Sequence, residues 1–96
     1  MFLGTGKKSY KKAYYLAELE DAPQHIKYRY YADLNNGDVT TVGLECVTKI
    51  GEEYVSFKDI FKVSPKNLDN KPLDIKEHIE LFLNILKTPS SAVVFE

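Results

Sequence analysis

Few side chains in this sequence are of the types that perform catalysis or bind metals. The nucleophilic or metal-binding groups are one cysteine, Cys46, and two histidines, His25 and His78. A metal or acid–base site needs such groups at a set spacing, for example two histidines four residues apart on a helix. His25 falls on a predicted strand and His78 on a predicted helix, and no such spacing joins them. We therefore expect no metal and no cofactor.

The remaining candidates for catalysis also have simpler explanations. Alternation places Cys46 on the buried side of a predicted sheet, where a free cysteine behaves as a small apolar residue. A lone cysteine also excludes an internal disulfide and a multi-cysteine zinc site. Residues 4–9, GTGKKS, lack the phosphate-loop pattern, because Lys8 stands where the hydroxyl residue should be and no strand precedes. We predict that the protein is not an enzyme.

Tyrosines and basic residues alternate on one side of two predicted strands, and they form the candidate binding surface. Aromatic and basic side chains together suit either an anchored protein partner or stacked nucleic acid bases. Glutamates, among them Glu45, share this side and favour a protein partner over phosphates. The predicted partner-binding residues are Tyr14, His25, Lys27, Arg29 and Tyr31.

Nucleic-acid binding is the alternative function. It would use the same surface together with a basic N-terminal cluster of Lys7, Lys8, Tyr10, Lys11 and Lys12. Thirteen basic and fourteen acidic residues give a formal net charge of −1, whereas nucleic-acid-binding domains usually carry a net positive charge. A third alternative, a small ligand held between helix and sheet, would need a cavity there.

Length and composition indicate one folded domain over residues 1–96. A chain of 96 residues has no room for a second core, and its 44% hydrophobic and 28% charged residues are ordinary for a globular domain. Residues 1–8 show no periodicity and are expected to be a flexible arm. No apolar run is long enough for a signal peptide or a membrane span, which predicts an intracellular, cytoplasmic protein.

The segment 24–34 is the predicted central strand. Ile26, Tyr28, Tyr30 and Ala32 alternate with polar residues, as in a strand with one buried side. The preceding segment, 9–20, has helix-forming residues, but its lysines lie at the start and its acids at the end, opposing the helix dipole. A strand suits it better, because one hairpin register then matches both faces. That register pairs Ala13 with Ala32, Tyr14 with Tyr31, Tyr15 with Tyr30, Ala17 with Tyr28 and Lys12 with Asp33.

Two further strands are predicted to continue the sheet. A three-residue loop, 35–37, with Gly37 in the left-handed conformation, would pair Tyr30 with Val42 and Tyr28 with Leu44. It would also set Lys27 against Glu45. A strand over 39–49 would follow, and a turn at Gly51-Glu52 would lead into the next strand.

The fourth strand is predicted to leave the regular pattern part-way along. The turn at 51–52 sets Val55 opposite Thr48, Phe57 opposite Cys46 and Lys58 opposite Glu45. Alternation then fails at Asp59, which predicts a bulge, kink or single helical turn near residues 58–60.

A helix is predicted after the polar segment 64–72. Asp74 followed by Glu77 suggests a capping box, and Thr88-Pro89 should end the helix. Its apolar stripe contains Ile75, Ile79, Phe82 and Leu86. This arc is wider than one sheet contact needs, and the tail 92–95 is apolar, so we expect either a fifth edge strand or a homodimer contact.

The predicted fold is α+β: a four-stranded antiparallel meander with one C-terminal helix packed on one face, to which the C-terminal tail could add a fifth edge strand. The predicted function is that of a small accessory or regulatory protein that acts by binding another protein. Stoichiometric inhibitors or adaptors, including those carried by phages and mobile elements, are of this type.

Overall fold

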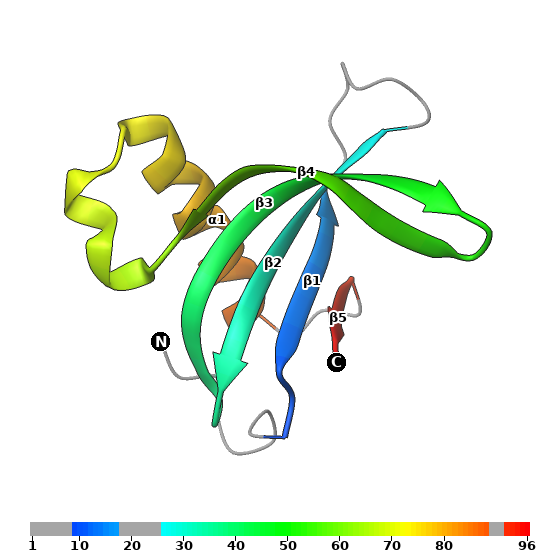
Figure 1. Ribbon diagram of the computed structural model, residues 1–96. Coiled ribbons are helices and arrows are strands. Elements are labelled where there is room, and N and C mark those ends of the chain that lie inside the picture. Colours follow the sequence, from blue (N-terminus) through cyan, green and yellow to red (C-terminus); the bar gives the residue numbers. More distant parts are fainter. Residues whose placement is uncertain (1–8, 18–25, 89–91) are drawn as a thin grey trace.

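The computed structural model describes residues 9–17, 26–88 and 92–96, which form a five-stranded antiparallel sheet with a helix on one face (Figure 1). The strand order is β4-β3-β2-β1-β5. This arrangement confirms the predicted α+β fold. The elements are β1 (Lys12–Ala17), β2 (Lys27–Asn35), β3 (Asp38–Ile50), β4 (Glu53–Val63), the short 3₁₀ helix η2 (Pro65–Asn70), α1 (Leu73–Lys87) and β5 (Val93–Phe95).

The hairpin of β1 and β2 has the predicted register. Ala13 pairs with Ala32, Tyr15 with Tyr30, and Ala17 with Tyr28. These residues lie on the face that α1 covers, which we call the inner face, and the opposite side is the outer face. The outer-face pairs Tyr14–Tyr31 and Lys12–Asp33 are also as predicted.

The turn between β2 and β3 differs from the prediction. It is a two-residue turn, with φ of 51° at Asn36 and 85° at Gly37, a combination that fits the right-handed twist of the flanking strands. A bulge next to it then shifts the register, because Leu34 pairs with Val39 while Asp33 pairs with Thr41. Thr40 is the extra residue, and its hydroxyl donates a hydrogen bond to the Asp33 carbonyl at 3.2 Å.

The bulge keeps the apolar residues of β3 on the inner face although the turn is short. Tyr30 pairs with Leu44 instead of Val42, and Tyr28 pairs with Cys46 instead of Leu44. On the outer face Arg29, and not Lys27, stands opposite Glu45. The predicted three-residue loop was therefore wrong, and so was the register derived from it.

The pairing of β3 with β4 is interrupted twice. The turn at Gly51-Glu52 and the pair Thr48–Val55 are as predicted. Farther along, Cys46 pairs with Lys58 and Glu45 with Asp59, so the predicted partners Phe57 and Lys58 were wrong.

Two extra residues in β4 account for these shifts. Phe57 and Ile60 have no opposite partner in β3. The bulge at Ile60 lies within the predicted stretch 58–60, whereas the bulge at Phe57 does not. Bulges bend a strand and increase its twist. The long β3–β4 hairpin accordingly curves away from α1 beyond the rest of the sheet (Figure 1).

Helix α1 covers the inner face with its predicted apolar stripe. Ile79, Phe82 and Leu86 are buried, and the ring of Phe82 stacks on that of Tyr30 with centroids 5.3 Å apart. The helix ends before Thr88, as predicted. The predicted capping box does not form. The N-cap residue is Pro72, whose side chain makes no capping hydrogen bond. Leu73 and Asp74 are already helical, so Asp74 lies too far along the chain to be the cap.

The C-terminal tail forms the fifth strand. β5 lies antiparallel beside β1, with Phe95 opposite Ala13 and Val93 opposite Tyr15 (Figure 1). Backbone hydrogen bonds between Lys12 and Glu96 close this pairing. Val93 is buried on the inner face, whereas Val94 is exposed. Of the two roles expected for the tail, the edge strand is thus confirmed.

Candidate protein-binding surface

An ion pair with a stacked aromatic ring lies at the centre of the outer face. The Nε atom of Arg29 donates a hydrogen bond to Oε1 of Glu45 at 2.7 Å, and a second guanidinium nitrogen lies 2.7 Å from the same oxygen. The guanidinium carbon also lies 4.4 Å from the ring centroid of Tyr14, within the range of cation–π attraction. Glu45 is only 7% exposed. The position of Arg29 is thus fixed, and its charge is compensated from within the protein.

Tyr31 also lies on the outer face, but its ring is packed into the surface. It is 6% exposed and covers Gly43 on the neighbouring strand, where a Cβ atom would overlap the ring. Lys12 Nζ lies 5.8 Å from its ring centroid. The pKa of Tyr31 is raised to about 12, mainly by burial and to a smaller extent by the nearby carboxylates of Asp59 and Glu45. Tyr31 therefore supports the surface from below and offers little area to a partner.

Three charged side chains form a second cluster on the same face. Lys12 lies 3.2 Å and Lys62 3.7 Å from the two carboxylate oxygens of Asp33. Burial alone would lower the pKa of Lys12, but its hydrogen bond and charge interaction with Asp33 outweigh burial and raise it. Both lysines are about half exposed, so the cluster contributes little to stability and is accessible from outside.

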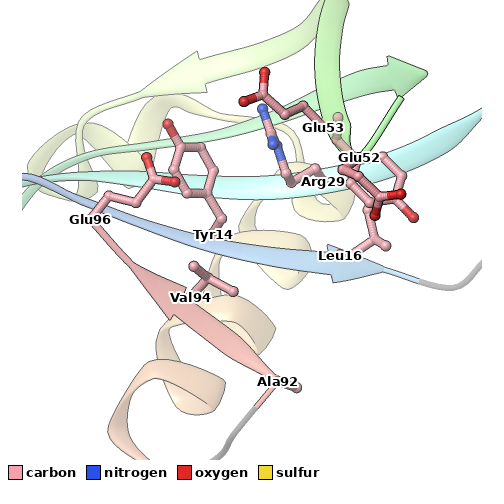
Figure 2. Close-up of a pocket in the computed structure, with 9 residues that line it drawn as sticks. Tyr14, Leu16, Arg29, Glu52, Glu53, Ala92, Val94 and Glu96 are labelled. Atoms are coloured by element: carbon pink, nitrogen blue, oxygen red, sulfur yellow. The ribbon is translucent and has the colours of Figure 1, made fainter. Parts of the chain in front are cut away.

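A hollow of about 630 Å³ opens between the outer face and the curved end of the β3–β4 hairpin (Figure 2). Its floor is built from alternate residues of three adjacent strands, which project to the same side. The hairpin end forms its wall. The floor residues are Ala92, Val94 and Glu96 next to β1, Tyr14 and Leu16 in β1, and Arg29 in β2, and the wall residues are Glu52, Glu53 and Tyr54.

The structure brings together two of the five predicted contact residues. Tyr14 and Arg29 line the hollow, and both side chains rise from the sheet toward the hairpin (Figure 2). Lys27 is partly buried and is not part of the lining, and Tyr31 is buried. His25 lies outside the described residues.

The N-terminal cluster is described only in part. Lys7 and Lys8 lie outside the described residues, as does the predicted flexible arm. Lys11 and Lys12 are exposed, and Lys12 is paired with Asp33. The ring of Tyr10 packs against Phe95 with centroids 5.4 Å apart, at the margin of the core. The side chain of Tyr10 therefore packs within the protein and is not displayed as part of a basic surface.

Sequence reasoning missed the acidic wall of the hollow. Glu52, Glu53 and Tyr54 line the hollow together with residues of β1 and β5 because the end of the hairpin curves to the outer side of the sheet. The bend follows from two bulges, and only one of them had a signal in the sequence. The contribution of Glu96 depends on the pairing of β5, for which the apolar tail was the signal.

Of the groups of catalytic type, the two in the described part of the chain, Cys46 and His78, do not line the hollow. Cys46 is buried, as predicted, opposite Tyr28 and Lys58. His78 is hydrogen-bonded through Nδ1 to the hydroxyl of Tyr30 on the inner face, and its ring also packs against Phe61. Within residues 9–17, 26–88 and 92–96, no three side chains of the His, Cys, Asp or Glu types are grouped to hold a metal ion.

The chain matches no protein-family model, no curated protein and no solved structure. In the part of the chain that the structure describes, the helix is too short and too polar to cross a membrane.

Proposed function

We propose that this protein acts by binding another protein, as a small accessory or regulatory protein of the inhibitor or adaptor type, and that it catalyses no reaction. The observation that carries the proposal is the hollow beneath the β3–β4 hairpin. It combines aromatic, aliphatic and charged side chains on a rigid sheet, the mixture found where proteins bind one another.

The rigidity of the floor adds to this argument. Tyr14 is held by the guanidinium of Arg29, and Arg29 by Glu45. Side chains that are already ordered lose little conformational entropy when a partner binds, which increases affinity. A tyrosine in such a position has the properties of an interface anchor.

Nucleic-acid binding by the same face has weaker support. The hollow is lined by Glu52, Glu53 and Glu96, which repel phosphates. Arg29 is neutralised by Glu45, and Tyr31 is too deeply packed to stack on a base. Lys11 and Lys12 are exposed, Lys12 on the outer face, and they form the basis of the competing function.

A capture experiment from the native host lysate tests the proposal. Tagged wild-type protein and a Tyr14→Ala variant are compared with and without nuclease, and Leu81→Ala is the control because Leu81 is exposed on α1. We expect one protein to be recovered by the wild type and by Leu81→Ala, to survive nuclease, and to be lost with Tyr14→Ala.

Two results would contradict the proposal. One is the recovery of nucleic acid alone, with binding that weakens steeply as salt rises and disappears in Lys11→Glu/Lys12→Glu. The other is a captured protein that Tyr14→Ala retains at the wild-type level, which would place the binding surface elsewhere.

A further inference from the structure

The hollow carries an excess of negative charge. Three of its lining residues are glutamates, Glu52, Glu53 and Glu96, and within the described chain none of the three is ion-paired. Among the lining residues that the structure describes, Arg29 is the one cation, and Glu45 already compensates its charge. A ligand that fills the hollow must therefore bring positive charge or leave carboxylates desolvated without a partner.

The rest of the lining suits an elongated apolar stem. Leu16, Val94 and Ala92 give the floor an aliphatic strip, and Tyr14 and Tyr54 add aromatic rings. Arginine and lysine side chains consist of such a stem with a charged head, and they bury the stem while the head meets polar groups. Glu53 of the wall lies across the hollow from Val94 and Ala92, whereas Glu52 is drawn near Leu16 (Figure 2).

Arginine fits this lining better than lysine. Its planar guanidinium presents several donors to neighbouring carboxylates and stacks on aromatic rings, whereas lysine has a compact charge. The protein's own Arg29 makes both kinds of contact in the floor, with Glu45 and Tyr14. The volume of about 630 Å³ leaves room for the neighbouring residues of an extended peptide beside one such side chain.

We propose that the hollow binds an arginine side chain presented by an extended, basic segment of the partner protein. This inference rests on the proposed function and specifies the chemistry of the partner. Glu96 adds negative charge at the Tyr14 end of the hollow (Figure 2), Glu52 and Glu53 bind the guanidinium, and the strip of Leu16 and Val94 receives the aliphatic stem. Tyr14 and Tyr54 flank it.

Peptide titrations monitored by NMR test the proposal on the full chain. The probe is an acetylated, amidated heptapeptide of alanine and serine with arginine at its centre. The matched peptides carry citrulline, which keeps the shape but loses the charge, or glutamate. We expect the arginine peptide to shift the amide resonances of Tyr14, Leu16 and Val94. We expect the citrulline peptide to bind about tenfold or more weakly, because hydrogen bonds between charged groups are lost.

A pair of double variants separates local charge from total charge. Glu52→Gln/Glu53→Gln removes two carboxylates from the exposed turn of the hollow. Glu77→Gln/Glu80→Gln removes two exposed carboxylates from α1 and leaves the same net charge. We expect the first pair to weaken binding of the arginine peptide by about tenfold and the second pair to leave it within twofold.

The outcomes distinguish this inference from the proposed function. If the arginine and citrulline peptides bind equally, or both double variants bind alike, the inference is wrong. If a protein partner is captured through Tyr14 but its affinity is unchanged by Glu52→Gln/Glu53→Gln, the inference fails and the proposed function stands. If the arginine peptide binds as expected but no protein is captured, the arginine-binding chemistry of the hollow stands, whereas a partner protein as the source of the arginine fails together with the proposed function.

Discussion

Tyr31 and Gly43 stand opposite each other on β2 and β3, and the tyrosine ring occupies the space that a side chain at Gly43 would take. Glycine is otherwise unfavourable inside a strand, because it loses more backbone entropy and packs no side chain. At this position its absence of a Cβ atom lets the ring lie flat against the sheet. The two residues therefore form one packing unit.

Gly43→Ala should destabilise the protein by about 1–3 kcal/mol, because the new methyl group overlaps the Tyr31 ring. In a Tyr31→Ala background the same substitution should have no cost, since alanine favours a strand more than glycine does. Urea denaturation of the four proteins of this double-mutant cycle measures both values. Equal costs in the two backgrounds would show that the ring does not occupy this space.

Alkaline pH should destabilise the protein through Tyr31. Its pKa is raised from 10.0 to about 12 by burial and by the nearby carboxylates, so the folded state favours the neutral phenol. The stabilisation is complete below pH 10 and is lost as the pH rises through 12. Tyr31→Phe should remove the contribution of Tyr31 and leave stability flatter across that window, while Tyr30, whose pKa is also raised by burial, keeps its own contribution. A phenolate absorbance titration without a late-titrating tyrosine in the wild type would contradict the prediction.

The pair Arg29–Glu45 should contribute more to stability than the exposed pair Lys12–Asp33. Glu45→Gln leaves a guanidinium without its carboxylate in a largely buried position, at a cost of about 1–3 kcal/mol. Lys12→Ala should change stability by less than about 1 kcal/mol. Thermal and urea unfolding of both variants give the comparison, and equal small effects would show that solvent screens the Arg29 pair as well.

Phe82→Ala should have the largest effect on helix docking. Phe82 is fully buried against Tyr30, and removal of a buried phenylalanine ring costs about 3–5 kcal/mol. Leu81→Ala, on the adjacent position, should cost less than about 0.5 kcal/mol because Leu81 is 53% exposed. If Phe82→Ala remained fully folded with an unchanged unfolding midpoint, α1 would not be held to the sheet by this contact.

The sequence predicts the β1–β2 hairpin because both faces agree on one register. Apolar pairs such as Ala13–Ala32 and charge pairs such as Lys12–Asp33 would all be lost by a slip of one residue. The sequence also predicts the helix, because its buried residues Ile79, Phe82 and Leu86 repeat at helical spacing.

The other registers could not be derived from alternation alone. A bulge adds one residue to one strand and moves every later pair, and Thr40, Phe57 and Ile60 each do so here. A bulged residue obeys no periodicity, so an apolar residue such as Phe57 reads as inward-facing although it is exposed. The hollow depends on these bends. Tyr14 and Arg29 in its floor were therefore among the predicted partner-binding residues, whereas Glu52, Glu53 and Tyr54 in its wall were not.

The bulges of β4 also bear on self-assembly. β4 is an outer strand of the sheet, and Phe57 and Ile60 are exposed on it, a combination that in a smooth strand invites another chain to pair and aggregate. Two copies of β4 paired antiparallel about a twofold axis would set Lys58 against Lys58, or Asp59 against Asp59, at the centre, where like charges repel. The bulges on either side break the regular row of hydrogen-bonding groups that a second copy would need. The irregularities that bend the hairpin over the hollow thus also protect this edge from fibril-like growth.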